Sequence, residues 1–239
     1  VKMVRKLLKD SGYEHIAADS TTKEKFLADL AGLEDTHLEE GGKAKSVDTI
    51  GDLVDIFEEE DLAYAAPAEC YITADEFNDF MGIGNLEFAS LLGTFWDYEG
   101  VYTSRTKNSK SISIPNPTIS ILGGNTPTGF SLAFPPEIIG QGFLSRVILV
   151  HGEPNGRKIA FPEPPDASIR AELVSMLTRI RCSIAGEAVL TSEARDLLEK
   201  IYCEWPPLDD YRFAHYHNRR FNQLIKLSMI VAASNLRCE

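Results

Sequence analysis

The stretch from Cys70 to Met81 constrains the fold more than any other part of the sequence. Residues 71–74 have the apolar pattern of a short strand, and two adjacent acids, Asp75 and Glu76, follow directly. In open α/β sheets, ligand and catalytic sites lie outside the carboxyl ends of the strands. Two neighbouring acids there suit the coordination of Mg²⁺ and the orientation of an attacking water. An acidic helix N-terminus, which the helix dipole favours, explains the pair equally well.

The composition is that of an ordinary soluble globular protein with a negative net charge. Of its 239 residues 44% are hydrophobic, and 36 acids against 24 bases leave a net charge of −12. Such a chain is no general polyanion binder, so any contact with nucleic acid has to be local. The four cysteines (Cys70, Cys182, Cys203 and Cys238) show no paired spacing, which argues against zinc and disulfides and for a reducing cytoplasm, that of the host if the protein is viral. We find no signal peptide and no apolar run near the roughly 20 residues of a membrane span.

The order of patterns predicts an α/β domain followed by a small helical one. Residues 1–151 mix strand and helix patterns, residues 152–166 are rich in Pro and Gly, and residues 167–239 read as helices. The mostly parallel sheet of the first domain is expected to be flanked by helices and to carry an inserted hairpin. The sequence starts in helical register and stops inside an apolar-periodic run, so we expect a fragment of a longer protein.

Residues 101–114 are typical of a β-hairpin that turns near Asn108. The segment contains three bases (Arg105, Lys107 and Lys110) and no acid, which is unusual in so acidic a chain. Lysines protect an edge hairpin from aggregation, and this is one explanation. A finger that contacts phosphates is the other.

Two further polar residues border predicted buried strands. Asn125 follows the strand pattern of residues 117–122, where it suits a hydrogen bond to phosphate or water as well as a Gly-Pro turn. Arg146 stands directly before the apolar run 147–151, where it suits an ion pair or a phosphate contact.

Other segments lead to weaker expectations. The run Gly41-Gly-Lys-Ala-Lys-Ser is not a phosphate-binding loop, because Ala44 takes the position of the required Ser or Thr and no strand pattern precedes it. We predict a loop over residues 36–49 and helices over 1–11, 47–62 and about 211–236.

Three motifs occur in one order: a strand into Asp75-Glu76-Phe77, a strand into Gly124-Asn125, and Leu144-Ser-Arg146 before a strand. In this order they resemble the later part of a P-loop ATPase core of the AAA+/RecA-like kind. The likeness is to phage primase–helicases and to replicative helicases of the minichromosome-maintenance type. It covers roughly residues 70–151. The Walker A loop is missing, and residues 1–11 match the end of the helix that follows such a loop.

The resemblance implies a role for each motif residue. Asp75 would hold Mg²⁺, Glu76 would position water, and Asn125 would sense the γ-phosphate of ATP. Arg146 would act on the site of a neighbouring subunit, which implies a homo-oligomeric ring, expected to be a hexamer. A lid residue that contacts the nucleotide would be Arg219 or Arg220.

The implied function is an ATP-hydrolysing motor on single-stranded or duplex DNA, a phage-type replicative helicase whose hairpin bases contact the DNA. Two alternatives stay open. One is a phage DNA-packaging ATPase of the terminase kind, which shares the acids and the strand order. The other is a structural or interaction module that keeps the fold without catalysis, in line with the missing Walker A loop.

Overall fold

The computed structural model describes most of the chain. The described residues are 1–32, 66–105, 111–135, 142–153, 155–207, 209–210 and 213–236. By their internal contacts they form two compact units, residues 1–2 with 15–135 and residues 3–14 with 136–239. Three sequence predictions lie outside the described residues: the loop 36–49, the helix 47–62, and the placement of Lys107 and Lys110.

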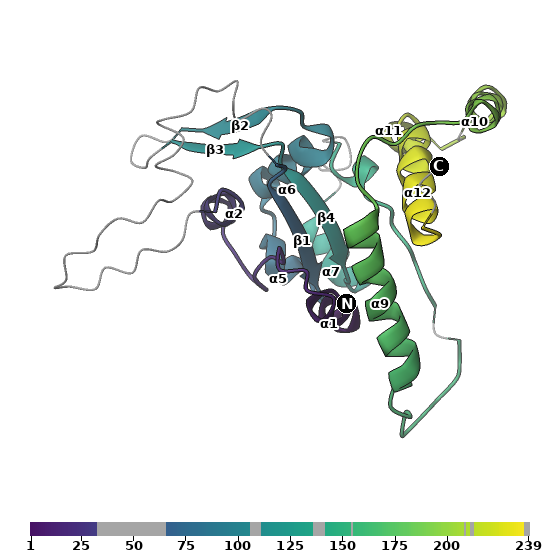
Figure 1. Ribbon diagram of the computed structural model, residues 1–239. Coiled ribbons are helices and arrows are strands. Elements are labelled where there is room, and N and C mark those ends of the chain that lie inside the picture. Colours follow the sequence, from purple (N-terminus) through teal and green to yellow (C-terminus); the bar gives the residue numbers. More distant parts are fainter. Residues whose placement is uncertain are drawn as a thin grey trace, which may run out of the picture. The chain divides into compact units, whose positions relative to one another are not determined.

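Figure 1 shows the helices and strands of the described residues. In chain order they are α1 (Lys2–Asp10), α2 (Lys23–Leu30), β1 (Glu69–Ala74), α5 (Phe77–Met81), α6 (Leu86–Thr94), the 3-10 turn η1 (Phe95–Asp97), β2 (Val101–Ser104), β3 (Ile112–Pro115), β4 (Thr118–Gly123), α7 (Pro127–Ala133), the 3-10 turn η2 (Leu144–Arg146), α9 (Ala167–Ser183), α10 (Ser192–Glu204), α11 (Ala214–His217) and α12 (Arg220–Ser234).

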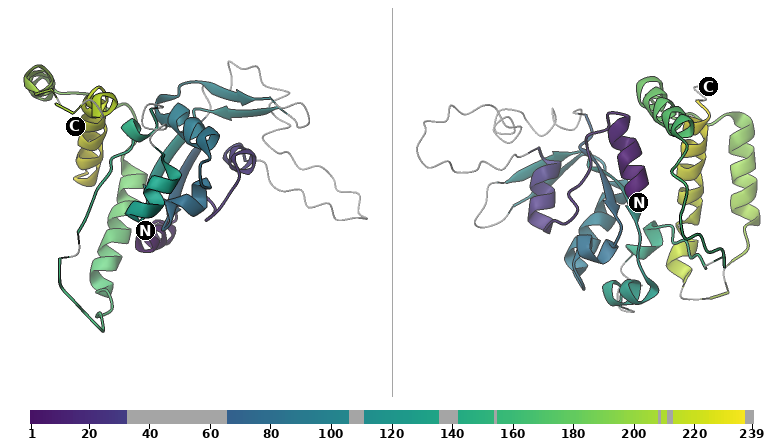
Figure 2. Two further views of the ribbon diagram at one scale, coloured as in Figure 1. Left: turned by 180° about the vertical axis from the view of Figure 1, so that it is seen from behind. Right: turned by 90° about the horizontal axis from the view of Figure 1, so that it is seen from below.

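A parallel pair of strands forms the centre of the first unit. Strand β1 pairs with β4 from Glu69 opposite Thr118 to Ala74 opposite Gly123. Figures 1 and 2 show the two strands side by side. On the other side of β1, a single parallel bridge joins Ile16 to Tyr71. The protein is therefore mixed α/β with a small parallel sheet.

Aromatic side chains fill the core of this unit. Phe80 and Phe88 are 1% and 0% exposed, and their ring centroids lie 5.6 Å apart. Phe26 of α2 completes the cluster at 5.3 Å from Phe88. Helix α2 starts at a capped turn, where the Thr22 side chain accepts a hydrogen bond from the amide of Lys25. This packing anchors α5 and α6, the two helices that follow β1.

The predicted hairpin is present. Strands β2 and β3 pair antiparallel, from Val101 opposite Pro115 to Ser104 opposite Ile112. Ile114 of β3 is fully buried, so the base of the hairpin is fixed in the core of the first unit. Figure 1 shows the two strands as a separate pair of arrows.

The second unit consists of helices with polar and aromatic links between them. In this unit, Arg170 and Arg181 of α9 donate hydrogen bonds to the Asp10 carboxylate and the Gly12 carbonyl. Tyr202 of α10 and Phe221 of α12 meet edge to face at 4.9 Å. Helices α9 and α10 agree with the expectation that residues 167–239 are helical.

Two predicted strands and one predicted helix need correction. The buried strand over residues 147–151 is wrong: no strand forms there, and Leu149 and Val150 are 58% and 89% exposed. Strand β4 forms as predicted but is only half buried, because it pairs on one side alone within the described residues. Among the described residues, no strand pairs with residues 147–151, so this run lacks the backbone partner that a sheet requires.

The single helix predicted over residues 211–236 is interrupted. Helix α11 ends at His217 and α12 begins at Arg220. At the interruption the amide of Arg219 donates to the carbonyl of Tyr216, three residues back, instead of four. Asn218 and Arg219 at this tighter turn line a polar pocket.

Candidate functional site

The carboxyl ends of β1 and β4 meet through the backbone. The amide of Gly124 donates to the carbonyl of Ala74 at 2.9 Å, and the amide of Phe77 donates to the carbonyl of Gly124 at 2.8 Å. These two bonds continue the parallel ladder beyond the last paired residues, and they enclose Asp75 and Glu76. Asn125 follows directly on the partner strand. The structure therefore brings together three of the residues that the sequence analysis selected.

The approach of the two segments requires glycine on β4. A Cβ atom at Gly124 would lie 2.7 Å from the backbone oxygen of Asp75, and one at Gly123 would lie 2.9 Å from the ring of Phe77. The first contact is with backbone, which cannot rotate away. The pair of glycines thus explains how the main chain of 75–77 packs against the end of β4.

Both acids reach solvent. The Asp75 side chain is 42% exposed and forms an ion pair with the Lys2 ammonium at 3.1 Å, while the N-terminal amine lies 3.9 Å away. Glu76 is exposed and occupies the N-cap position of α5, but its side chain makes no capping hydrogen bond. Glu76 therefore stands at a helix N-terminus, as the structural explanation of the acidic pair expects, but its side chain is not used as a cap.

The residues at this edge fit a magnesium ion of the kind that binds through phosphate. Mg²⁺ is held in such sites by one or two carboxylates together with waters and phosphate oxygens. Asp75 offers an accessible carboxylate. A divalent cation can take the place of the Lys2 ammonium beside it. No group of three or more His, Cys, Asp or Glu side chains that would hold a metal by itself occurs in the described part of the chain.

Asn125 is fixed by a second asparagine. Its Nδ2 donates to Oδ1 of Asn78 in α5 at 2.8 Å, and Nδ2 of Asn78 donates to the carbonyl of Gly129 in α7 at 2.8 Å. Oδ1 of Asn125 is buried and has no hydrogen-bond partner among the described residues. Two short helices that follow the two parallel strands are joined through these side chains.

Arg146 lies in the second unit, in the 3-10 turn η2. Its Nη1 donates to the carbonyl of Gly142 at 2.8 Å, and the same carbonyl accepts a 2.7 Å bond from the Ser145 hydroxyl. Gly142 has a φ of 87°, and a Cβ there would lie 2.7 Å from Nη1 of Arg146. The turn is fixed to α12 by Gln223, which is 3% exposed and donates to the carbonyl of Ser145 at 3.0 Å.

Arg219 and Arg220, the two candidates for a lid residue that contacts the nucleotide, have different surroundings in the structure. Arg220 packs over the ring of Trp205, with 4.2 Å from the guanidinium carbon to the ring centroid, and donates to the carbonyl of Pro206. Its role is to join α10 to α12. Arg219 instead lines a polar pocket of about 360 Å³ at the interruption before α12. The pocket lining consists of Gly142, Ser145, His215, Asn218, Arg219 and Asn222.

Among the described residues that line this pocket there is no carboxylate. Arg219 lines the pocket, and so does Gly142, whose carbonyl accepts the hydrogen bond from Arg146. The 3-10 turn that contains Arg146 therefore borders this pocket. Within the second unit, Arg146 and Arg219 are therefore associated with one polar site.

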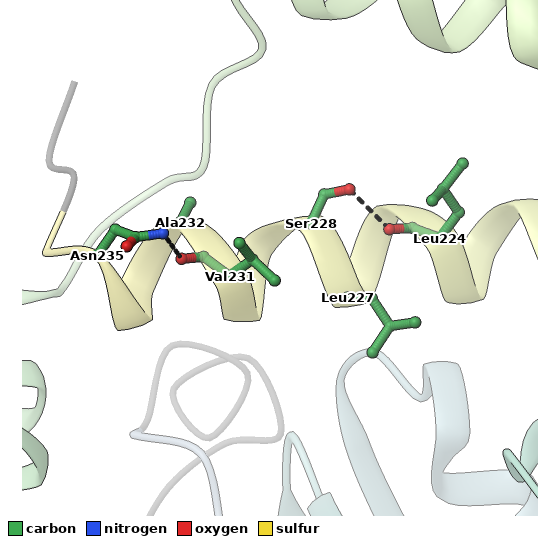
Figure 3. A pocket seen from close by; sticks show the side chains of 6 residues that line it. All are labelled: Leu224, Leu227, Ser228, Val231, Ala232 and Asn235. Carbon is green, nitrogen blue, oxygen red and sulfur yellow. Dashed lines mark hydrogen bonds between the residues drawn. The ribbon is translucent and has the colours of Figure 1, made fainter. Parts of the chain in front are cut away.

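A second pocket lies along α12 and is apolar. Figure 3 shows its lining, which consists of Leu224, Leu227, Ser228, Val231, Ala232 and Asn235. The two polar members donate to their own helix, Ser228 to the carbonyl of Leu224 and Asn235 to that of Val231. The described residues that line this pocket therefore include no acid, base or nucleophile suited to catalysis.

The basic hairpin is described in part. Arg105 directly follows β2 and is exposed, whereas Lys107 and Lys110 lie outside the described residues. An exposed guanidinium at this position is compatible with a phosphate contact and with a solvated edge.

Sequence reasoning missed Lys2, Asn78 and Gly129. Lys2 is distant from Asp75 in the chain, and no local pattern indicates their ion pair. Asn78 stands two residues after Glu76, but its importance depends on a contact with Asn125, 47 residues further on. A weak signal exists for Gly129, since a glycine inside a helix pattern calls for a packing reason.

No protein-family model, curated protein or solved structure matches this chain. No helix in the described ranges is long and apolar enough to cross a membrane.

Proposed function

We propose that this chain belongs to an ATP-hydrolysing nucleic-acid motor of the phage replicative helicase type. The proposal is carried by one observation: Asp75, Glu76 and Asn125 gather where two adjacent parallel strands end. Ligands of open α/β sheets bind outside the carboxyl ends of the strands. An accessible pair of acids beside an amide supplies two of the parts that phosphoryl transfer to water uses, a ligand for Mg²⁺ and a group that positions the water.

Each residue has a separate task in this proposal. Asp75 would provide the carboxylate for Mg²⁺, which when bound neutralises charge on the phosphates. Glu76 would accept a hydrogen bond from the attacking water and orient it toward the terminal phosphate. This role suits its exposed carboxylate, which makes no capping bond.

The remaining residues would act between molecules. Arg146 would reach the nucleotide of a neighbouring subunit in a homo-oligomeric ring, and an arginine supplied in this way is worth about 10³–10⁵ in rate. Arg219, which lines the polar pocket, is the better of the two lid candidates, because Arg220 is engaged by Trp205. Arg105, Lys107 and Lys110 would contact DNA phosphates locally, despite the net charge of −12.

The test is ATP hydrolysis by the full-length protein with and without single-stranded DNA. We expect hydrolysis that DNA stimulates, and a Glu76→Gln variant that binds ATP but barely turns it over. Glu99→Gln removes the same charge from an exposed position of the same unit and should hydrolyse normally. Normal turnover by Glu76→Gln would refute the assignment of the water-orienting residue. Stimulation by duplex DNA alone would favour a packaging motor.

A second candidate is a binding module without catalysis. The ion pair between Lys2 and Asp75 favours it, because the lysine neutralises the carboxylate that would hold the metal. Such a module would be a stable monomer that does not bind ATP. Native mass spectrometry of the full-length protein with and without nucleotide distinguishes the two candidates.

A further inference from the structure

The hydrogen bonds around Asn125 define the direction in which its amide points. We propose that Asn78 is a positioning residue, which orients Asn125 so that it presents an N–H donor, and not its carbonyl, to a phosphate oxygen of the bound nucleotide. This inference rests on the proposed function and adds to it a residue that has no place in the sequence motifs.

The orientation follows from an acceptor that cannot turn. The carbonyl of Gly129 belongs to the backbone of α7 and can only accept, so the Asn78 end that lies 2.8 Å from it must be Nδ2. Oδ1 of Asn78 then faces Asn125. Because that oxygen also only accepts, the Asn125 end that lies 2.8 Å from it must be Nδ2. One backbone carbonyl thereby sets the polarity of both side-chain amides.

Gly129 encloses the other end of the Asn125 amide. A Cβ at position 129 would lie 2.5 Å from Oδ1 of Asn125 and 2.8 Å from Nδ2 of Asn78. Oδ1 is buried and has no partner among the described residues. A rotation that exchanged the two ends would place two oxygens, Oδ1 of Asn125 and Oδ1 of Asn78, against each other. The network therefore resists such a rotation.

The chemical consequence concerns the kind of ligand. An asparagine amide nitrogen has two N–H donors, and the bond to Asn78 uses one of them. The second has no partner among the described residues and is available to an oxyanion. Because Oδ1 is enclosed, Asn125 in this orientation suits a phosphate oxygen and does not suit a metal ion.

The kinetic test uses the full-length protein and a double-mutant cycle. Asn125→Ala removes the donor itself, and removal of one such donor typically slows the chemical step by about 10²–10³. Asn78→Ala removes only its support, for which we expect roughly a 10–100-fold loss of kcat with little change in KM. The double variant should be no slower than Asn125→Ala, since Asn78 has no effect once the amide it orients is gone.

Asn85→Ala is the matched control for a loss of stability. Asn85 begins α6 in the same unit by accepting a hydrogen bond from the amide of Phe88, and in the described part of the chain it forms no hydrogen bond with Asn78 or Asn125. The control should lower stability and leave kcat unchanged. If Asn78→Ala slows hydrolysis no more than Asn85→Ala does, or if the losses of Asn78→Ala and Asn125→Ala multiply in the double variant, the inference is overturned.

A second measurement does not depend on catalysis. The side-chain ¹⁵NH₂ signals of Asn125 should shift and exchange faster with solvent in Asn78→Ala, because one N–H loses its acceptor. Unchanged signals would overturn the geometry even in an active enzyme. Absence of ATP hydrolysis by the wild type would overturn the proposed function and the positioning role with it. In that case, a shift of the Asn125 ¹⁵NH₂ signals in Asn78→Ala would still establish the hydrogen bond.

Discussion

Replacement of Gly124 by alanine tests whether main-chain contact holds the site together. A Cβ at this position would lie 2.7 Å from the backbone oxygen of Asp75, where ordinary contacts begin at 3.4 Å. Relief of the clash has to stretch the bonds from Gly124 to Ala74 and from Phe77 to Gly124, now 2.9 and 2.8 Å.

The magnitude follows from two opposing effects. Overpacking of this kind costs about 1–3 kcal/mol. Alanine also restricts the unfolded chain, which stabilises the protein by about 0.4–1 kcal/mol wherever the backbone conformation suits it. The clash outweighs this gain, so Gly124→Ala should lower the free energy of unfolding by about 1–2 kcal/mol. With a typical urea dependence, the midpoint would fall by about 0.5–1 M.

The two tryptophans allow each unit to be followed separately. Trp96 lies in the first unit and Trp205 in the second, and the chain has no others. Urea unfolding of Gly124→Ala is therefore measured by fluorescence in a Trp205→Phe background. Gly152→Ala, in a Trp96→Phe background, is the control, because a Cβ at Gly152 meets no atom within 4 Å. A Gly124→Ala midpoint at or above that of its parent would refute the reasoning.

Four further outcomes are expected. Lys2→Ala removes the ion pair with Asp75. Because Lys2 is 91% exposed, the free energy of unfolding measured in urea titrations should change by less than about 0.5 kcal/mol. A loss several times larger would contradict a solvent-screened pair. Burial raises the pKa of the Cys70 thiol to about 11. At pH 8 an aromatic disulfide reagent should therefore modify Cys70 more slowly than the exposed thiols of Cys182 and Cys203. Equal rates would contradict this prediction. The raised pKa of Cys70 also makes the free energy of unfolding depend on pH. The stabilisation is fully present below pH 9 and is lost as the pH rises toward 11, because the Cys70 thiol of the unfolded chain releases its proton at lower pH than that of the folded chain. Arg220→Ala should destabilise the second unit by about 0.5–2 kcal/mol and change the emission of Trp205, and an unchanged spectrum would show that the stacked contact is absent in solution.

Local pattern was sufficient for most helices and strands. Strands β1 and β4, the hairpin, and helices α9 and α10 are all encoded by periodicity and by turn or cap residues within each segment. The site edge was predictable for a related reason. Parallel strands end on the same side of a sheet, so acids after one strand and an asparagine after the next come together.

The errors occurred where the outcome depends on a distant partner. The apolar run 147–151 has the composition of a buried strand, but a strand also needs a neighbour with free backbone groups, and composition carries no information on that. The interruption at Asn218 and Arg219 has no proline or glycine to indicate it. The link from Asn78 to Asn125 depends on where two helices place their side chains, which no spacing rule specifies.

The backbone bonds that enclose Asp75 and Glu76 separate the stability of the fold from the chemistry of the site. The main chain holds residues 74–77 in place, while both carboxylates extend into solvent and contribute little to packing. Substitutions at these two positions can therefore test activity without the confounding effect of misfolding. By the same reasoning, relatives that retain acids at 75 and 76 would do so under selection on activity, because the main-chain bonds that hold this segment use neither carboxylate.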